Sequence, residues 1–121
     1  MTHASIPRFG EGFLLTRATM RWFYDHYLRQ PAGVEDWRAS VTRTGSLSGA
    51  ARLGLDGRLD PLWDEGQAYV SRLRDQGVAG RHRHFSDQIY GFLTMGKIIR
   101  AAEPDLDEIA AALTAVWEEE P

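Results

Sequence analysis

The chain has 121 residues, enough for one domain, with 14 basic and 17 acidic side chains and no cysteine. The missing cysteines exclude disulfides, thiolate metal ligands and a cysteine nucleophile, and the net charge of −3, with interspersed signs, excludes a nucleic-acid-binding face. The N-terminus lacks a signal-peptide core, and the longest apolar run, Ile109 to Trp117, is too short to span a bilayer. We therefore expect a soluble cytoplasmic protein.

Residues 1–12 show no helical or strand period and predict an N-terminal loop, so that residues 13–121 form a single domain. After Thr16, which can cap a helix, apolar and aromatic side chains recur at helical spacing. These side chains are Met20, Phe23, Tyr24, Tyr27 and Leu28. The Pro-, Gly-, Ser- and Thr-rich residues 30–50 then predict a long connection.

A strand is predicted over Leu53–Leu59, where leucine alternates with other residues, and it ends at the turn signal Asp60-Pro61. A helix follows from Asp64, with Gln67 three residues later as a capping-box-like pair. Gly77 has the position of the residue that ends such a helix in a left-handed conformation.

Residues 78–85 predict a weaker strand, residues 86–90 (SDQIY) a turn, and residues 92–102 a helix. The capping-box-like pair Asp105 and Glu108 opens a last helix. This order predicts the α/β class, with few parallel strands flanked by helices. Two strands are too few for a stable sheet, so either the loops contain further strands or another chain supplies them.

Asp56 is unusual in the first predicted strand, because a parallel strand covered on both faces is normally apolar throughout. Burying a carboxylate without a partner costs several kcal/mol. We therefore predict that Asp56 is exposed to solvent or paired with an arginine.

A set of motifs resembles the hormone-sensitive-lipase-like carboxylesterase branch of the α/β-hydrolase fold, in its C-terminal part only. Asp60 to Gly66 (DPLWDEG) is followed in the family's order by Ala68-Tyr69, Gly77-Val78 and Gly91 to Met95 (GFLTM). The likeness covers roughly residues 10–117. It implies that Asp60 has the position of the triad acid. It also implies that Tyr90 stands in place of the triad histidine.

The family's oxyanion motif HGG and its nucleophile motif GDSAGG are both absent from this sequence. The nearest segment, Gly45 to Gly49, has Leu47 at its centre and precedes a strand, whereas a nucleophile elbow follows one. A phenol, with a pKa of about 10, is a poor general base at neutral pH. The resemblance therefore implies a truncated, degenerate esterase relative that hydrolyses no ester by itself and needs no cofactor.

Several alternatives remain open from the sequence. Asp60 can be a turn or capping residue, and Tyr90 a packed aromatic residue. His82 and His84, two residues apart on a strand, can begin a metal site, although a solvated strand face is the simpler interpretation. The chain can also be a partner module, which completes a hydrolase with an N-terminal half or forms a homo-oligomer. A small ligand-binding protein or atypical esterase on the same scaffold is the third alternative. No membrane partner is expected.

Overall fold

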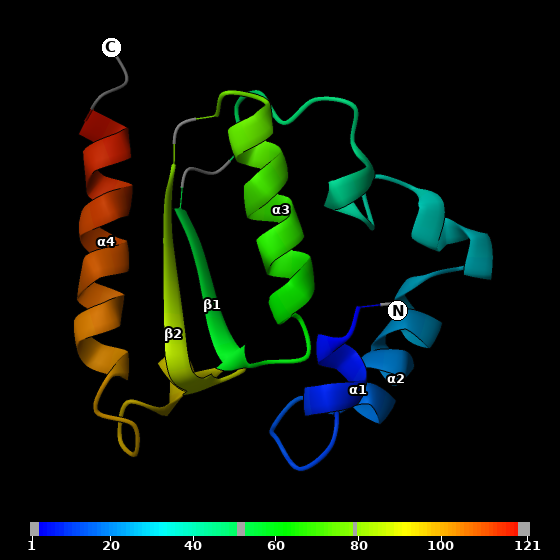
Figure 1. The fold of residues 1–121 in the computed structure, drawn as a ribbon, viewed down its shortest axis with the longest axis horizontal. Helices are drawn as coiled ribbons and strands as arrows, with labels where there is room; N and C mark the ends of the chain where they lie inside the picture. Colours follow the sequence, from blue (N-terminus) through cyan, green and yellow to red (C-terminus); the bar gives the residue numbers. More distant parts are fainter. Residues whose placement is uncertain (1–2, 51–52, 79, 119–121) are drawn as a thin grey trace. The chain divides into compact units, whose positions relative to one another are not determined.

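The computed structural model describes residues 3–50, 53–78 and 80–118, which fall into two compact units divided after Tyr90. The elements of the first unit are α1 (Ser5–Phe9), α2 (Arg17–Tyr27), the 3₁₀ helices η1 (Pro31–Glu35) and η2 (Val41–Arg43), β1 (Leu53–Leu59), α3 (Trp63–Asp75) and β2 (Arg81–Ile89) (Figure 1). The second unit contains the 3₁₀ helix η3 (Phe92–Met95) and α4 (Ala102–Glu118). A single domain over residues 13–121 stays a prediction.

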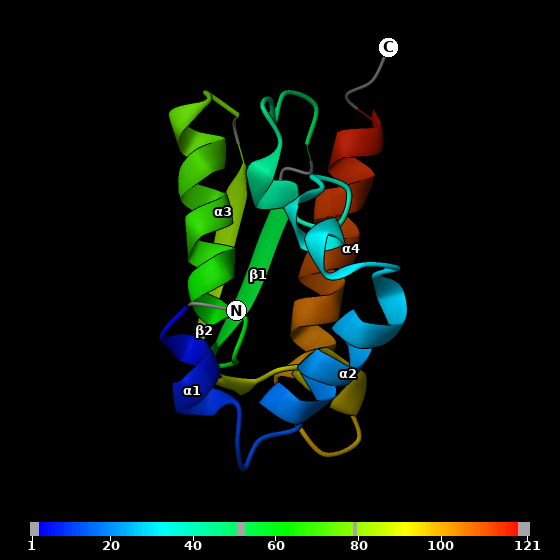
Figure 2. The same cartoon turned by 90° about the vertical axis from the view of Figure 1, so that its right-hand side faces the viewer.

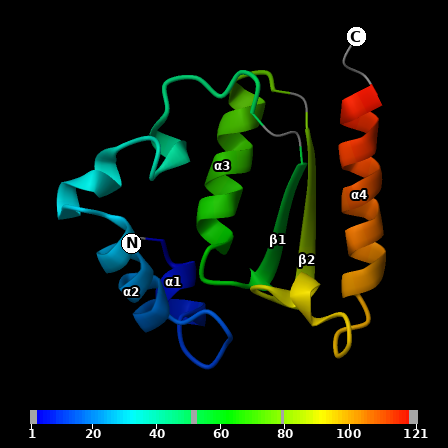
Figure 3. The same cartoon turned by 180° about the vertical axis from the view of Figure 1, so that it is seen from behind.

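The sheet of the first unit consists of β1 and β2, which pair in parallel, as predicted. Parallel neighbours need a crossover connection, and α3 provides it, packing beside β1 (Figures 1 and 3). The α/β class is thereby confirmed. The connection over residues 30–50 contains η1 and η2 and no strand, so it adds no third strand to this sheet.

The helix α2 begins where the sequence predicts it, with Thr16 as the N-cap. The Thr16 hydroxyl oxygen accepts a hydrogen bond from the backbone N–H of Thr19 at 3.1 Å. Met20 is buried on its inner face, whereas Trp22, Phe23 and Tyr27 are exposed. The aromatic residues of α2 therefore lie largely outside the core of this unit.

The two ends of α3 differ in how well the sequence predicts them. At its C-terminus Gly77 has φ +69°, and the N–H groups of Gly77 and Val78 donate to the carbonyls of Arg74 and Leu73, which confirms the expected glycine stop. The predicted capping box is wrong, because α3 begins at Trp63 without a side-chain cap. The Gln67 side chain instead donates to the Asp56 carboxylate in the neighbouring strand.

The N-terminal segment forms the short helix α1 where a loop was predicted. Contacts distant in sequence hold it: the Ser5 hydroxyl donates to the Pro61 carbonyl at 2.7 Å, and the Ser5 N–H donates to the Asp64 carboxylate at 2.8 Å. Ile6 and Phe9 are buried on the same helix. α1 consequently lies beside the start of α3 (Figure 2), next to the turn that carries Asp60.

The strand β2 runs to Ile89, so the predicted turn over residues 86–90 is wrong for all but its last residue. The strand is irregular there, since β2 has two more residues than β1 between the pairs Gly57–Phe85 and Leu59–Ile89. A Cβ atom on Gly57 would lie 2.6 Å from the Gln88 carbonyl oxygen. Gly57 therefore allows the irregular part of β2 to approach the backbone of β1.

The second unit also departs from its predicted elements. The helix expected over residues 92–102 is limited to η3, and α4 begins already at Ala102. Asp105 and Glu108 therefore lie inside α4 and do not open it. Pro104 does not stop the helix, because in the first turn its missing N–H has no partner to lose. Among the helices of the described residues, none has the combined length and hydrophobicity that a membrane crossing requires.

Candidate functional site

Asp60 and Tyr90 lie at the same edge of the sheet. Leu59 and Ile89 form the last registered pair of β1 and β2, and Asp60 and Tyr90 are the residues that follow them. The carboxyl ends of neighbouring parallel strands are where open α/β sheets form their binding sites. The structure therefore brings together the two residues that the sequence singles out.

The Asp60 carboxyl group is almost buried, with 9% of the residue exposed, and its Oδ1 accepts the backbone N–H of Leu62 at 2.8 Å. Burial raises the pKa of Asp60 above its ordinary value, the Leu62 hydrogen bond acts in the opposite direction, and the Asp56 carboxylate adds to the increase. The hydrogen bond from Leu62 agrees with the alternative that Asp60 is a turn residue. Burial at the edge of the sheet also suits an acid that orients a catalytic base.

Replacing Asp60 by asparagine is expected to stabilise the fold at neutral pH. Because the folded-state pKa of Asp60 is raised, its contribution to stability is complete below the unfolded-state pKa and is lost as pH rises through the folded-state value. Asparagine keeps an acceptor for Leu62 and does not ionise. Urea denaturation should show Asp60→Asn about 1 kcal/mol more stable than the unsubstituted chain at pH 7, and equal to it near pH 3. An advantage that is larger at the acidic pH would contradict this account.

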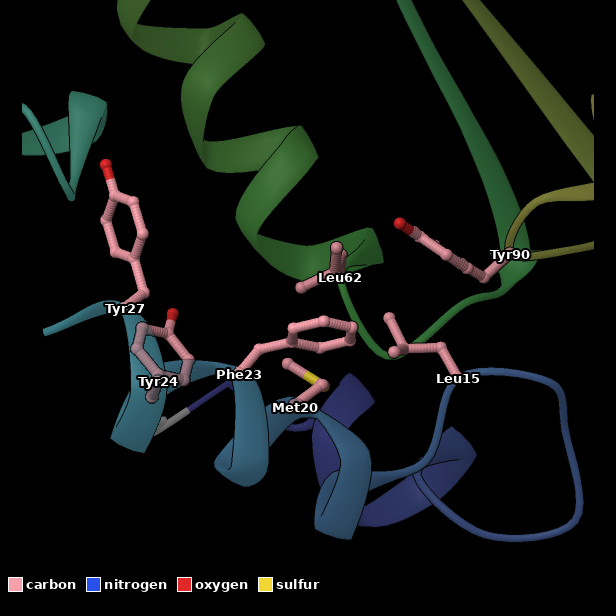
Figure 4. A pocket seen from close by; sticks show the side chains of 7 residues that line it. All are labelled: Leu15, Met20, Phe23, Tyr24, Tyr27, Leu62 and Tyr90. Atoms are coloured by element: carbon pink, nitrogen blue, oxygen red, sulfur yellow. The ribbon is translucent and has the colours of Figure 1, made fainter.

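Tyr90 lines a pocket of about 260 Å³ beside this edge (Figure 4). The other lining residues are Leu15, Met20, Phe23, Tyr24, Tyr27 and Leu62. In Figure 4 the Tyr90 ring reaches in from the end of β2, with its hydroxyl directed toward Leu62. Burial, and then the Glu65 carboxylate, raises the pKa of Tyr24, so its hydroxyl stays uncharged at neutral pH. The pocket therefore suits a small apolar group.

Asp56 is not exposed to solvent, since its side chain is only 8% exposed, and its described partners are two histidines and a glutamine. Its Oδ2 lies 2.7 Å from His82 Nε2 and 2.6 Å from Gln67 Nε2, and its Oδ1 lies 2.5 Å from His84 Nδ1. The solvated strand face is also wrong for His82, whose side chain is 12% exposed. In the part of the chain that the structure describes, no group of three His, Cys, Asp or Glu is arranged to hold a metal ion.

The two histidines on β2 do not reach the edge that holds Asp60. His84 is registered with Asp56, which precedes Asp60 by four residues, and a strand advances about 3.3 Å per residue, so the backbone separation is on the order of 13 Å. Neither histidine can therefore replace the imidazole that the resemblance expects at Tyr90. The spacing of His82 and His84, two residues apart, was a sequence signal that both lie on one face of β2, but only the strand register shows that Asp56 lies opposite His84.

Comparison with known proteins settles the family. Residues 1–94 match the family model described as alpha/beta hydrolase fold. This chain belongs to the α/β-hydrolase fold family. The site at the carboxyl ends of β1 and β2 is therefore a part of an α/β-hydrolase sheet.

The relatives of this α/β-hydrolase chain include esterases. It is 36% identical over 110 residues to an ethyl acetate hydrolase from Pseudomonas putida, covering 90% of this chain and 35% of that enzyme. It is 36% identical over 113 residues to the carboxylic ester hydrolase LipN from Mycobacterium tuberculosis, covering 92% of this chain and 30% of LipN. The chain thus spans about a third of the length of the curated relatives it matches.

Solved structures of esterases share the same fold. An ester hydrolase from the metagenome of Lake Arreo superposes with a TM-score of 0.88 and 29% identity, covering 98% of this chain and 38% of that one. An esterase from Pyrobaculum calidifontis gives a TM-score of 0.86 at 26% identity, covering 94% and 38%. These similarities confirm the resemblance to carboxylesterases that the motifs at residues 60–95 indicate.

Proposed function

We propose that this chain carries the acid turn and the base-position turn of a carboxylic-ester hydrolase site, and that this site hydrolyses no ester by itself. The observation that supports this most is the placement of Asp60 and Tyr90 directly after the paired residues Leu59 and Ile89. An acid and a base that follow neighbouring strands can act on one substrate. Here the base position holds a phenol.

Ester hydrolysis by a serine hydrolase requires an activated serine, a base that takes its proton and hydrogen-bond donors for the oxyanion. The sequence has neither the GDSAGG motif that carries the serine nor the HGG motif that supplies the oxyanion donors. The Gly45 to Gly49 segment lies in the connection before β1, and Leu47 at its centre is buried, with its N–H donating to the Gln76 side chain. We therefore infer a truncated and degenerate esterase relative.

The substrate class that the pocket favours is an ester with a small apolar group. The lining is made of leucine, methionine, phenylalanine and tyrosine side chains, and contains no charged residue. The volume of about 260 Å³ limits the group that it can enclose. A matched relative is named for its action on ethyl acetate, a small ester.

The proposal predicts no hydrolysis of ethyl acetate by the purified chain above the rate in buffer. Ethoxide is a poor leaving group, so hydrolysis requires the complete triad and an oxyanion hole. Acid release, followed by pH-stat titration, is the measurement. Turnover that Asp60→Asn abolishes would show that a complete site exists and would refute the proposal.

A second candidate function is that of a module that completes a hydrolase with a partner. The observation in its favour is the sheet, which among the described residues has only two strands. Two parallel strands are marginal as an independent sheet, and the edge strand of a sheet is in general a place where a further strand can pair. The partner in this second function is a hydrolase segment that carries the serine nucleophile. Assembly of the chain with itself, as a homo-oligomer, is the alternative outcome.

A further inference from the structure

The Asp56 carboxylate and His84 form an oriented pair that the proposed ester site does not use. Asp56 Oδ1 lies 2.5 Å from His84 Nδ1, while Asp56 Oδ2 already accepts hydrogen bonds from His82 and Gln67. The Asp56 side chain is 8% exposed, whereas that of His84 is 33% exposed. A buried acceptor thus holds one side of an imidazole ring that reaches solvent.

The pairing decides which ring nitrogen of His84 is available. An ionised carboxylate only accepts hydrogen bonds, so the short contact requires a proton on Nδ1. The neutral ring then has its lone pair on Nε2. Within the residues that the structure describes, His84 Nε2 has no hydrogen-bond partner. This is the tautomer and orientation that a carboxylate gives to a reactive histidine.

We propose that His84 Nε2 is a nucleophile that accepts acyl groups from aryl esters. The Trp63 ring lies beside it, with ring centroids 5.8 Å apart and planes tilted by 39°. An aromatic leaving group can pack against this indole. The activity is separate from the site at Asp60 and Tyr90 and does not depend on the proposed function.

The reaction balances with the ester and water alone. The Nε2 lone pair forms a bond to the acyl carbon, the bond between the acyl carbon and the phenolic oxygen breaks, and the phenolate leaves with the bonding electron pair. The ring becomes positively charged, and the Asp56 carboxylate stabilises that charge through Nδ1–H. The ring then gives its Nδ1 proton to solvent, and water hydrolyses the acyl-imidazole to the carboxylic acid. The phenolate is a good leaving group, so this step depends less on oxyanion donors than the expulsion of an alkoxide does.

His26 provides a matched control within the same chain. It is exposed, its Nδ1 lies 2.7 Å from the Trp22 carbonyl oxygen, and its ring stacks on Trp22 with centroids 4.1 Å apart. Both histidines therefore have an acceptor at Nδ1 and a neighbouring indole. They differ in that the acceptor of His26 is neutral and that of His84 is a carboxylate.

The test uses the full chain and p-nitrophenyl acetate. We expect mass spectrometry of the briefly treated protein to locate the acetyl group on His84 and not on His26. His84→Gln should lower the rate of nitrophenolate release by about a hundredfold. Asp56→Asn should lower it in the same direction, because an amide can donate to Nδ1 and reverse the tautomer. His26→Gln should leave the rate unchanged.

The adduct map needs no substitution, so it decides the outcome even where a variant fails to fold. An acetyl group on His26 or on another residue in place of His84 would overturn the proposal, and so would a folded His84→Gln protein with an unchanged rate. Ethyl acetate hydrolysis, in contrast, tests only the proposed function, because imidazole alone does not expel ethoxide.

Discussion

Asp56→Leu is expected to lower the free energy of unfolding by about 3–5 kcal/mol, the cost typical of removing one partner from a buried charged cluster. The change leaves donors of His82, His84 and Gln67 without their acceptor, and His82 is almost buried. Each donor that cannot reach water costs about 1–3 kcal/mol. Small domains have about 5–15 kcal/mol of total stability, so the effect is large.

The matched control replaces two of the three donors as well as the acceptor. In Asp56→Leu combined with His82→Leu and Gln67→Leu, most of the lost stability should return, since an apolar replacement of a buried polar cluster is often neutral. It would also give β1 the apolar character that covered parallel strands normally have. Urea denaturation measures both variants. A single substitution that costs less than about 1 kcal/mol would contradict the cluster's role.

Tyr90→His is expected to give ester hydrolysis when the variant is mixed with a hydrolase segment that carries the serine nucleophile. The mixture contains the Pseudomonas putida ethyl acetate hydrolase truncated to lack the 110 residues that align with this chain. A histidine at residue 90 would stand at the sheet edge that Asp60 shares and supply the base that the proposed site requires. Hydrolysis of ethyl acetate should exceed that of the same mixture with the unsubstituted chain by about a thousandfold.

The control for this experiment is Tyr90→His combined with Asp60→Asn, which keeps the imidazole and removes the orienting acid. We expect its rate to fall back toward that of the unsubstituted chain. Light scattering of each mixture reports whether the two polypeptides associate. Association of this chain only with itself would contradict the hydrolase segment as its partner.

Local sequence signals predicted the elements that depend on neighbouring residues. Thr16 caps α2, Leu53–Leu59 forms β1, and Gly77 ends α3, because each uses a conformation or hydrogen bond within a few residues. The edge position of Asp60 and Tyr90 followed from the resemblance together with the parallel order of the strands.

Contacts distant in sequence account for the differences. Hydrogen bonds from Ser5 to Pro61 and Asp64, just after β1, hold α1 in place. The capping box predicted at the start of α3 does not form, because the Gln67 side chain donates to Asp56. The pairing of Asp56 with histidines could not be predicted without the strand register, which aligns β1 with β2 although α3 separates them in the sequence. The pocket at Tyr90 likewise joins α2 to the ends of both strands.

Treating the purified protein with a fluorophosphonate and mapping the adducts by mass spectrometry tests whether this chain contains an activated serine. We expect that no serine carries the phosphonyl group. A stoichiometric adduct on one serine would contradict this expectation.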